Sequence, residues 1–94
     1  SNVARLDGYR VQIFDYHDNG EGLAIIRWLF TNKNDYKVNK IMWIGLYECE
    51  TNEHITSLVA FPQYTEPKET EENFTQTISL NKDYSYYIKL SWGN

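Results

Sequence analysis

The chain of 94 residues is poor in cysteine, in positive charge and in long apolar runs, and each shortage excludes something. Cys49 is the only cysteine, which excludes an internal disulfide. The net charge of −4 argues against nucleic acid, which requires a basic surface. No apolar run approaches the roughly 20 residues of a membrane-spanning helix. We therefore expect no nucleic-acid partner and no insertion into a membrane.

Residues that carry catalysis or hold metals are also scarce. The two histidines, His17 and His54, are expected in turns, and the Cys and His clusters of metal sites are absent from the sequence. Cys49 has no base beside it in the sequence, so we interpret it as a packed residue or an edge thiol. Glu48 and Glu50 share one face of a strand, and we interpret that face as solvated. The sequence therefore predicts no catalytic residue, no cofactor and no enzyme activity.

Aromatic residues, by contrast, are abundant, with 8 Tyr, 3 Trp and 4 Phe. Apolar residues recur with period two over six stretches, which is typical of β-strands. The predicted strands are residues 9–16, 23–31, 40–49, 54–61, 74–80 and 84–92. The stretches 23–31 and 40–49 are apolar on both faces, which favours central strands. The polar stretch 66–73 is expected to form an exposed acidic loop.

Six short strands separated by turn residues predict an all-β fold, an antiparallel two-sheet sandwich of immunoglobulin-like or jelly-roll type with six to seven strands. A single two-stranded sheet would not bury this much apolar surface. A seventh strand is absent, is supplied by residues near the N-terminus, or lies outside the sequence. We expect residues 1–94 to form one sandwich domain, with Ser1 and Asn2 as a remnant of a purification tag.

Leu80 and Tyr86 are six residues apart, across the residues "NKD". This spacing resembles the tyrosine corner of immunoglobulin-like and fibronectin type III domains, in which a Tyr hydroxyl bonds back to the backbone. The resemblance implies that Tyr86 is buried and that its hydroxyl bonds to the backbone near Leu80 or Asn81. It concerns the fold and implies nothing about function.

A second resemblance involves "IIRWLF" at 25–30 and "MWIGLY" at 42–47. Together they are similar to the SKICH domain, a small immunoglobulin-like sandwich with an aromatic-Ile/Val-Gly-Leu/Ile signature on one strand. Members of that family localise their proteins by binding partners, so the resemblance implies protein binding. The family usually has Asp before the tryptophan, where this chain has Met42. No functional residue is carried over from it.

The segment 15–22, "DYHDNGEG", partly matches a calcium-binding loop of the form D-x-[DN]-x-[DN]-G. Such a loop closes with a bidentate Glu at its twelfth position, where this chain has Ile26. Asn19 and Gly20 accept the positive φ of a type I′ turn and join two predicted strands. We therefore interpret the segment as a metal-independent hairpin. The weak candidates for a surface cation are Asp15, Asp18 and Glu21.

The predicted strands 40–49 and 84–92 carry aromatic residues on both faces, and only one face of each can fill the core. The expected core residues are Trp28, Ile44, Leu46, Tyr86, Ile88 and Leu90. The opposite faces then carry Arg27, Trp43, Tyr47, Tyr87 and Lys89, which we expect to form a strip across one sheet. Rings with a polar tip stack on sugars and dominate protein contacts. The predicted ligand-binding residues are therefore Trp43, Tyr47, Tyr87 and Arg27.

These observations favour a non-catalytic recognition module that binds carbohydrate through an aromatic sheet face. The alternative is a structural or assembly domain of a virion, fibre or cell-surface protein. In that case neighbouring subunits cover the two-sided strands, and the protein forms a homo-oligomer. A SKICH-like module that binds a protein partner is a further alternative. We expect an extracellular location, or one on a virion or cell surface.

Overall fold

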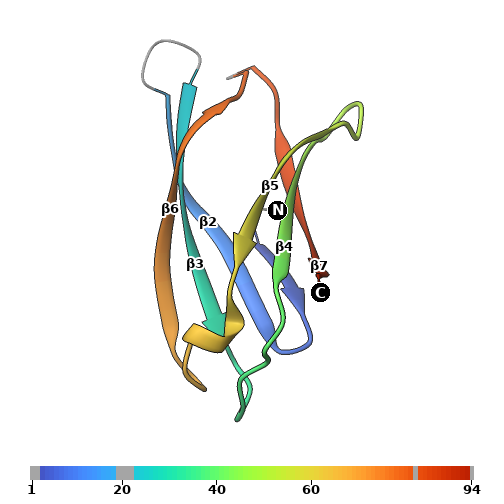
Figure 1. Ribbon diagram of the computed structural model, residues 1–94. Coiled ribbons are helices and arrows are strands. Elements are labelled where there is room, and N and C mark those ends of the chain that lie inside the picture. Colours follow the sequence, from blue (N-terminus) through green and yellow to red (C-terminus); the bar gives the residue numbers. More distant parts are fainter. Residues whose placement is uncertain (1–2, 19–22, 82, 94) are drawn as a thin grey trace.

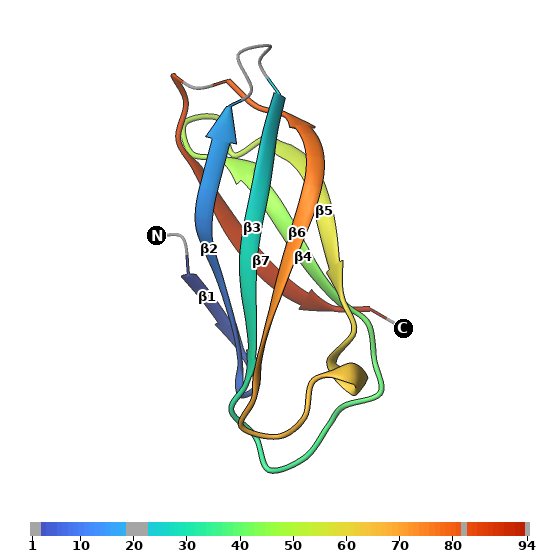
Figure 2. The ribbon, with the colours of Figure 1, turned by 90° about the vertical axis from the view of Figure 1, so that its left-hand side faces the viewer.

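The computed structural model describes residues 3–18, 23–81 and 83–93. For residues 14–18, 23 and 74–77 it describes the backbone alone. These residues form two antiparallel sheets packed face to face (Figures 1 and 2). The strands are β1 (Val3–Leu6), β2 (Tyr9–Asp18), β3 (Leu23–Asn32), β4 (Met42–Glu48), β5 (His54–Ala60), β6 (Thr70–Ser79) and β7 (Tyr86–Trp92), with a 3₁₀ helix η1 (Pro62–Tyr64). Their order is β1-β2-β3-β6 in one sheet and β5-β4-β7 in the other. The predicted all-β antiparallel sandwich is confirmed.

The core lies between the two sheets and is filled by the period-two residues, because successive side chains on a strand point to opposite faces. The largest buried apolar side chains include Tyr9, Ile26, Trp28, Phe30, Met42, Ile44 and Leu46. At one end, the ring of Tyr9 stacks on Phe30, with 5.3 Å between centroids, and meets the edge of Trp92 at 5.7 Å. The core is thus built from rings of both sheets.

The seventh strand, β1, comes from the N-terminal residues and pairs with the start of β2. Asp7 and Gly8 form the turn between them, with φ of 47° and 83°, as a two-residue type I′ hairpin requires. The N–H of Lys33 donates to the Gly8 oxygen at 2.8 Å, and a Cβ at Gly8 would overlap the side chain of Asn34. A four-residue strand is too short to show period-two alternation, so the sequence pattern did not predict β1. The Asp-Gly pair is the signal that could have indicated this hairpin.

Strand β6 begins at Thr70, so the expectation of a loop over 66–73 is wrong for its second half. Thr70–Asn73 pair with the last part of β3. The polar sequence concealed this strand because β6 is an edge strand, and edge strands tolerate and use charge. The carboxylate of Glu72 bonds to the guanidinium of Arg27, which ties the polar segment to β3.

The connection between β6 and β7 crosses from one sheet to the other and is fastened by Tyr86. The Tyr86 hydroxyl accepts the N–H of Asn81 at 2.9 Å and lies 3.3 Å from the Asn81 carbonyl oxygen, to which it donates. The predicted bond to the backbone is therefore confirmed. The predicted burial is only partial, because the ring is half-buried and packs against the rim of the core.

The strands β2 and β3 pair as a hairpin up to Asp18 opposite Ala24. The turn predicted at Asn19 and Gly20 lies outside the described residues, as do Ser1 and Asn2. Glu21 and the side chains of Asp15 and Asp18 also lie outside them. Within the part of the chain that is described, no three His, Cys, Asp or Glu residues are grouped to hold a metal. No described helix has the length and apolarity to cross a membrane.

Candidate functional site

Three of the four predicted ligand-binding residues lie on the outer face of the β5-β4-β7 sheet. Trp43 and Tyr47 come from the central strand β4, and Tyr87 comes from β7, where it pairs directly with Tyr47. Alternation along β4 explains this placement, since Ile44 and Leu46 on the other face are fully buried in the core. We call Trp43, Tyr47, Tyr87 and Lys89 the outer aromatic face.

Gly45 lies between Trp43 and Tyr47 on this face and lets the ring of Tyr47 lie down on the sheet. A Cβ at residue 45 would stand 2.8 Å from Cε2 of Tyr47, closer than real side chains come. The Tyr47 ring also stacks on Tyr87, with 5.4 Å between centroids and 18° between planes. The two tyrosine rings therefore form one ordered platform.

Polar groups surround this tyrosine pair. The Lys89 ammonium lies 5.1 Å from the centroid of the Tyr47 ring and 5.8 Å from that of Tyr87, within reach of a cation–π interaction. The Tyr87 hydroxyl donates to Oδ1 of Asn52 at 2.9 Å. The His54 ring lies 5.2 Å from Tyr47. His54 begins β5, so its expected position in a turn is wrong.

Trp43 occupies the other end of the outer aromatic face. Trp43 is 42% exposed, although it lies in the middle strand of the sheet. Among the described residues it makes no ring contact with another aromatic residue or with a cation. The Trp43 indole is therefore open to a ligand, whereas the two tyrosines already contact each other.

Arg27 does not belong to the strip, which corrects the sequence prediction. It lies on β3, in the other sheet, and its guanidinium bonds to Glu72 on β6. The outer faces of the two sheets point in opposite directions, so Arg27 is on the other side of the molecule from Trp43. Alternation assigns a residue to a face of its strand but does not say which sheet the strand joins.

Glu48 is also placed differently from the expectation of a solvated face, because it is only 3% exposed. Its carboxylate accepts the N–H of Glu50 at 2.9 Å, the N–H of Thr51 at 2.7 Å and the Thr51 hydroxyl at 2.6 Å. The Thr51 hydroxyl, followed by the two backbone N–H groups, lowers the pKa of Glu48 below its ordinary value. Glu48 thereby holds the β4–β5 turn, in which Asn52 has a φ of 61° and meets Tyr87. Cys49, beside it, is exposed.

His54 and Asn52 are residues of this site that sequence reasoning missed. They reach the outer aromatic face through the β4–β5 turn, and the register that places His54 opposite Tyr47 includes a bulge. Period-two alternation cannot anticipate a bulge, because the extra residue reverses the faces beyond it. Lys89 was already evident from alternation along its strand. Comparison of the chain with protein-family models, curated proteins and solved structures finds no match.

Proposed function

We propose that the domain is a non-catalytic recognition module that binds carbohydrate on its outer aromatic face. The observation that carries the proposal is the exposed Trp43 indole on a central strand, in line with the Tyr47–Tyr87 platform. Exposed apolar rings on a rigid sheet match the apolar faces of sugar rings. Lys89, Asn52 and His54 supply hydrogen-bonding groups beside the rings for sugar hydroxyls.

A glycan array followed by calorimetry tests the proposal. We expect weak binding, which Trp43→Ala abolishes without changing the free energy of unfolding. Tyr84→Ala is the matched control, because Tyr84 is also an exposed aromatic residue but does not belong to the face. The proposal would be contradicted if the parent protein bound no glycan, or if the Trp43→Ala variant bound glycan as well as the parent.

Assembly is the second candidate function, and the open edge of β5 favours it. Within the described residues β5 pairs only with β4, so its other edge carries backbone groups without a strand partner. Such an edge is a template for pairing with another chain, either a second copy or a protein partner, as a virion, fibre or cell-surface building block requires. Sedimentation at rising concentration tests this function. A protein that stays monomeric at every concentration and retains no protein partner would contradict it.

The bond between Tyr86 and Asn81 supports the resemblance to the tyrosine corner of immunoglobulin-like and fibronectin type III domains. On this basis we include kinship with those sandwiches, and an extracellular, virion-surface or cell-surface location, in the proposal. Labelling of the intact source with an antibody to the domain tests the location. Signal that appears only after permeabilisation would contradict it.

A further inference from the structure

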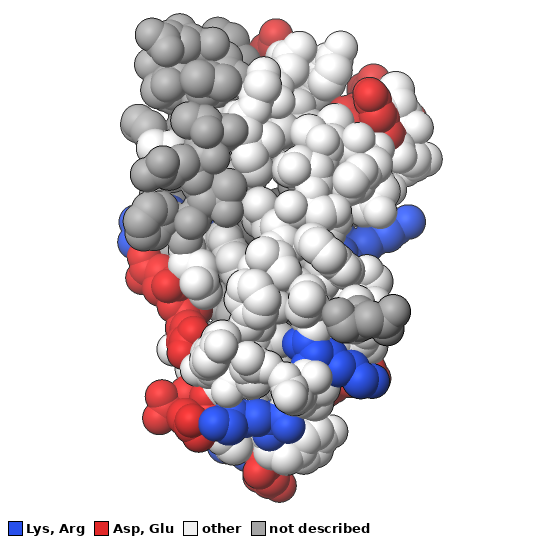
Figure 3. Space-filling view, viewed as in Figure 1, with Lys and Arg blue, Asp and Glu red and all other residues white. Residues whose placement is uncertain are grey.

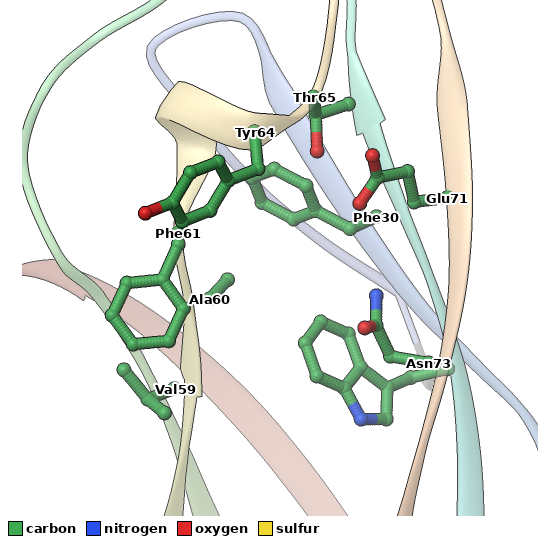
Figure 4. A pocket seen from close by; sticks show the side chains of 9 residues that line it. Phe30, Val59, Ala60, Phe61, Tyr64, Thr65, Glu71 and Asn73 are labelled. Carbon is green, nitrogen blue, oxygen red and sulfur yellow. The ribbon is translucent and has the colours of Figure 1, made fainter.

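A cleft of about 120 Å³ opens at one edge of the sandwich (Figure 4). It lies between β5 and β6, the edge strands of the two sheets, and is closed at one end by η1. The side chains that matter most are Trp28, Phe30, Phe61, Tyr64, Glu71 and Asn73. Four of these six are aromatic, and the lining residues include no Lys or Arg.

Two aromatic rings stand exposed at the mouth of this cleft. Phe61 is 46% exposed and Tyr64 is 67% exposed, with 6.2 Å between their centroids and 58° between their planes. The turn that carries them is closed by a backbone bond, in which the N–H of Tyr64 donates to the Phe61 oxygen at 3.0 Å. The next residue, Thr65, is buried, and its carbonyl accepts Nδ2 of the buried Asn32 at 3.2 Å. Exposed apolar rings on so firmly held a turn indicate an interaction site.

A carboxylate lines the cleft from the β6 side. Glu71 pairs with Phe30, and because paired residues share a face of the sheet, Glu71 points inward like Phe30. Figure 4 shows Glu71 and Asn73 on the β6 side of the cleft and Phe61 on the β5 side. Acidic side chains also gather on the surface over β6 (Figure 3).

Glu71 has no ion-pair partner among the described residues. Its neighbour Glu72 is bonded to Arg27, and Glu66 is bonded to Lys37 at 2.9 Å. An inward charge on an edge strand also discourages pairing with another chain. Preventing strand pairing would not require exposed aromatic rings on the opposite wall of the cleft. The presence of both the unpaired carboxylate and the rings therefore indicates a ligand.

We propose that the cleft binds a methylated ammonium group, held by the ring of Tyr64 and by the carboxylate of Glu71. The negative faces of aromatic rings attract organic cations, and quaternary ammonium groups are recognised in this way. A cavity of roughly 150 Å³ accommodates benzene, so a cleft of this size suits one trimethylammonium head. Drug-sized ligands occupy about 300 Å³ or more and would not fit. No residue of the outer aromatic face lines the cleft, and the proposal does not depend on carbohydrate binding.

Titration of the ¹⁵N-labelled protein with choline chloride, followed by NMR, tests the proposal. We expect saturable shifts of the Phe61, Tyr64 and Glu71 amides and of the Trp28 indole N–H, which has no hydrogen-bond partner. The neutral isostere 3,3-dimethylbutan-1-ol should bind about tenfold more weakly, since it lacks the cation–π and ionic attraction. Equal binding of the alcohol, or no shifts beyond those caused by sodium chloride, would overturn the proposal.

Variants then locate the binding groups. Tyr64→Ala should abolish choline binding and Tyr64→Phe should retain it, because the ring face is what matters. Glu71→Gln should weaken binding about tenfold. Glu72→Gln is the matched control, since it removes the same charge one residue away, where Glu72 bonds to Arg27. If the Glu71 and Glu72 variants weakened binding equally, the carboxylate would act only through long-range charge, and the proposed contact would be wrong.

Discussion

Aromatic residues of the same kinds lie in two regions of the molecule, between the sheets and on the outer face of the β5-β4-β7 sheet. Between the sheets, the rings pack in the core, and the polar groups of Tyr9 and Trp92 have protein partners. The Tyr9 hydroxyl accepts the N–H of Val38 at 3.2 Å, and Nε1 of Trp92 donates to Asp7 at 2.7 Å. On the outer face, Trp43 has an exposed ring and Tyr47 and Tyr87 are half-buried. The difference teaches that inner rings stabilise the fold, whereas outer rings provide a surface.

The largest expected effect separates the two regions directly. Phe30→Ala should lower the free energy of unfolding by about 3 to 5 kcal/mol, because it leaves a cavity beside Tyr9. Trp43→Ala should change it by less than about 0.5 kcal/mol, as expected for an exposed site. Urea denaturation measures both values. If both variants lost the same stability, the outer aromatic face would belong to the structural core.

A smaller effect is expected at the turn that supports the inner rings. Gly8→Val should cost about 1 to 3 kcal/mol, because it places a β-branched residue at a positive φ and against Asn34. The displaced turn should also loosen the bond from Trp92 to Asp7 and shift the tryptophan fluorescence to longer wavelength. A variant with the parent's melting temperature and emission would show that β1 is not needed to hold Trp92.

A pair of single-atom changes sharpens the comparison further. Tyr86→Phe removes the bond to Asn81, which fastens the crossover between the sheets, and should cost about 1 kcal/mol. Tyr87→Phe removes the bond to Asn52 on the exposed face, and water replaces it, so we expect less than about half that loss. Thermal melts of the two variants measure the difference. The reverse order would mean that the crossover is held by other contacts.

A pH-dependent effect is expected for Glu48→Gln, because glutamine loses the charge that the three donors of the turn face. The pKa of Glu48 is lowered in the folded state, so the ionised carboxylate favours folding. This stabilisation is present above the ordinary pKa of 4.5 and is lost as the pH falls through the lower folded value. The parent should therefore exceed the variant in stability at neutral pH and converge with it in acid. Glu50→Gln, at an exposed neighbour, should show no such convergence.

Much of the fold could be predicted from the sequence because burial imposes period two. The predicted inner faces of β3 and β4 match the buried residues Trp28, Ile44 and Leu46. Prediction failed where burial leaves no such trace. Strand β1 is short, and β6 begins with polar residues. Neither β1 nor the start of β6 therefore shows an alternating pattern of apolar residues. The candidate site was predicted only in its β4 and β7 residues.

The sequence by itself determined the all-β class, the central strands and the faces on which Trp28, Trp43, Tyr47 and Tyr87 lie. These follow from local alternation and from residue type. Only the tertiary structure decided which strands share a sheet, and thereby separated Arg27 from Trp43. It also brought Phe61 and Glu71 to the two sides of one cleft. Such juxtapositions depend on pairing between segments far apart in the chain, and a local pattern carries no information about that pairing.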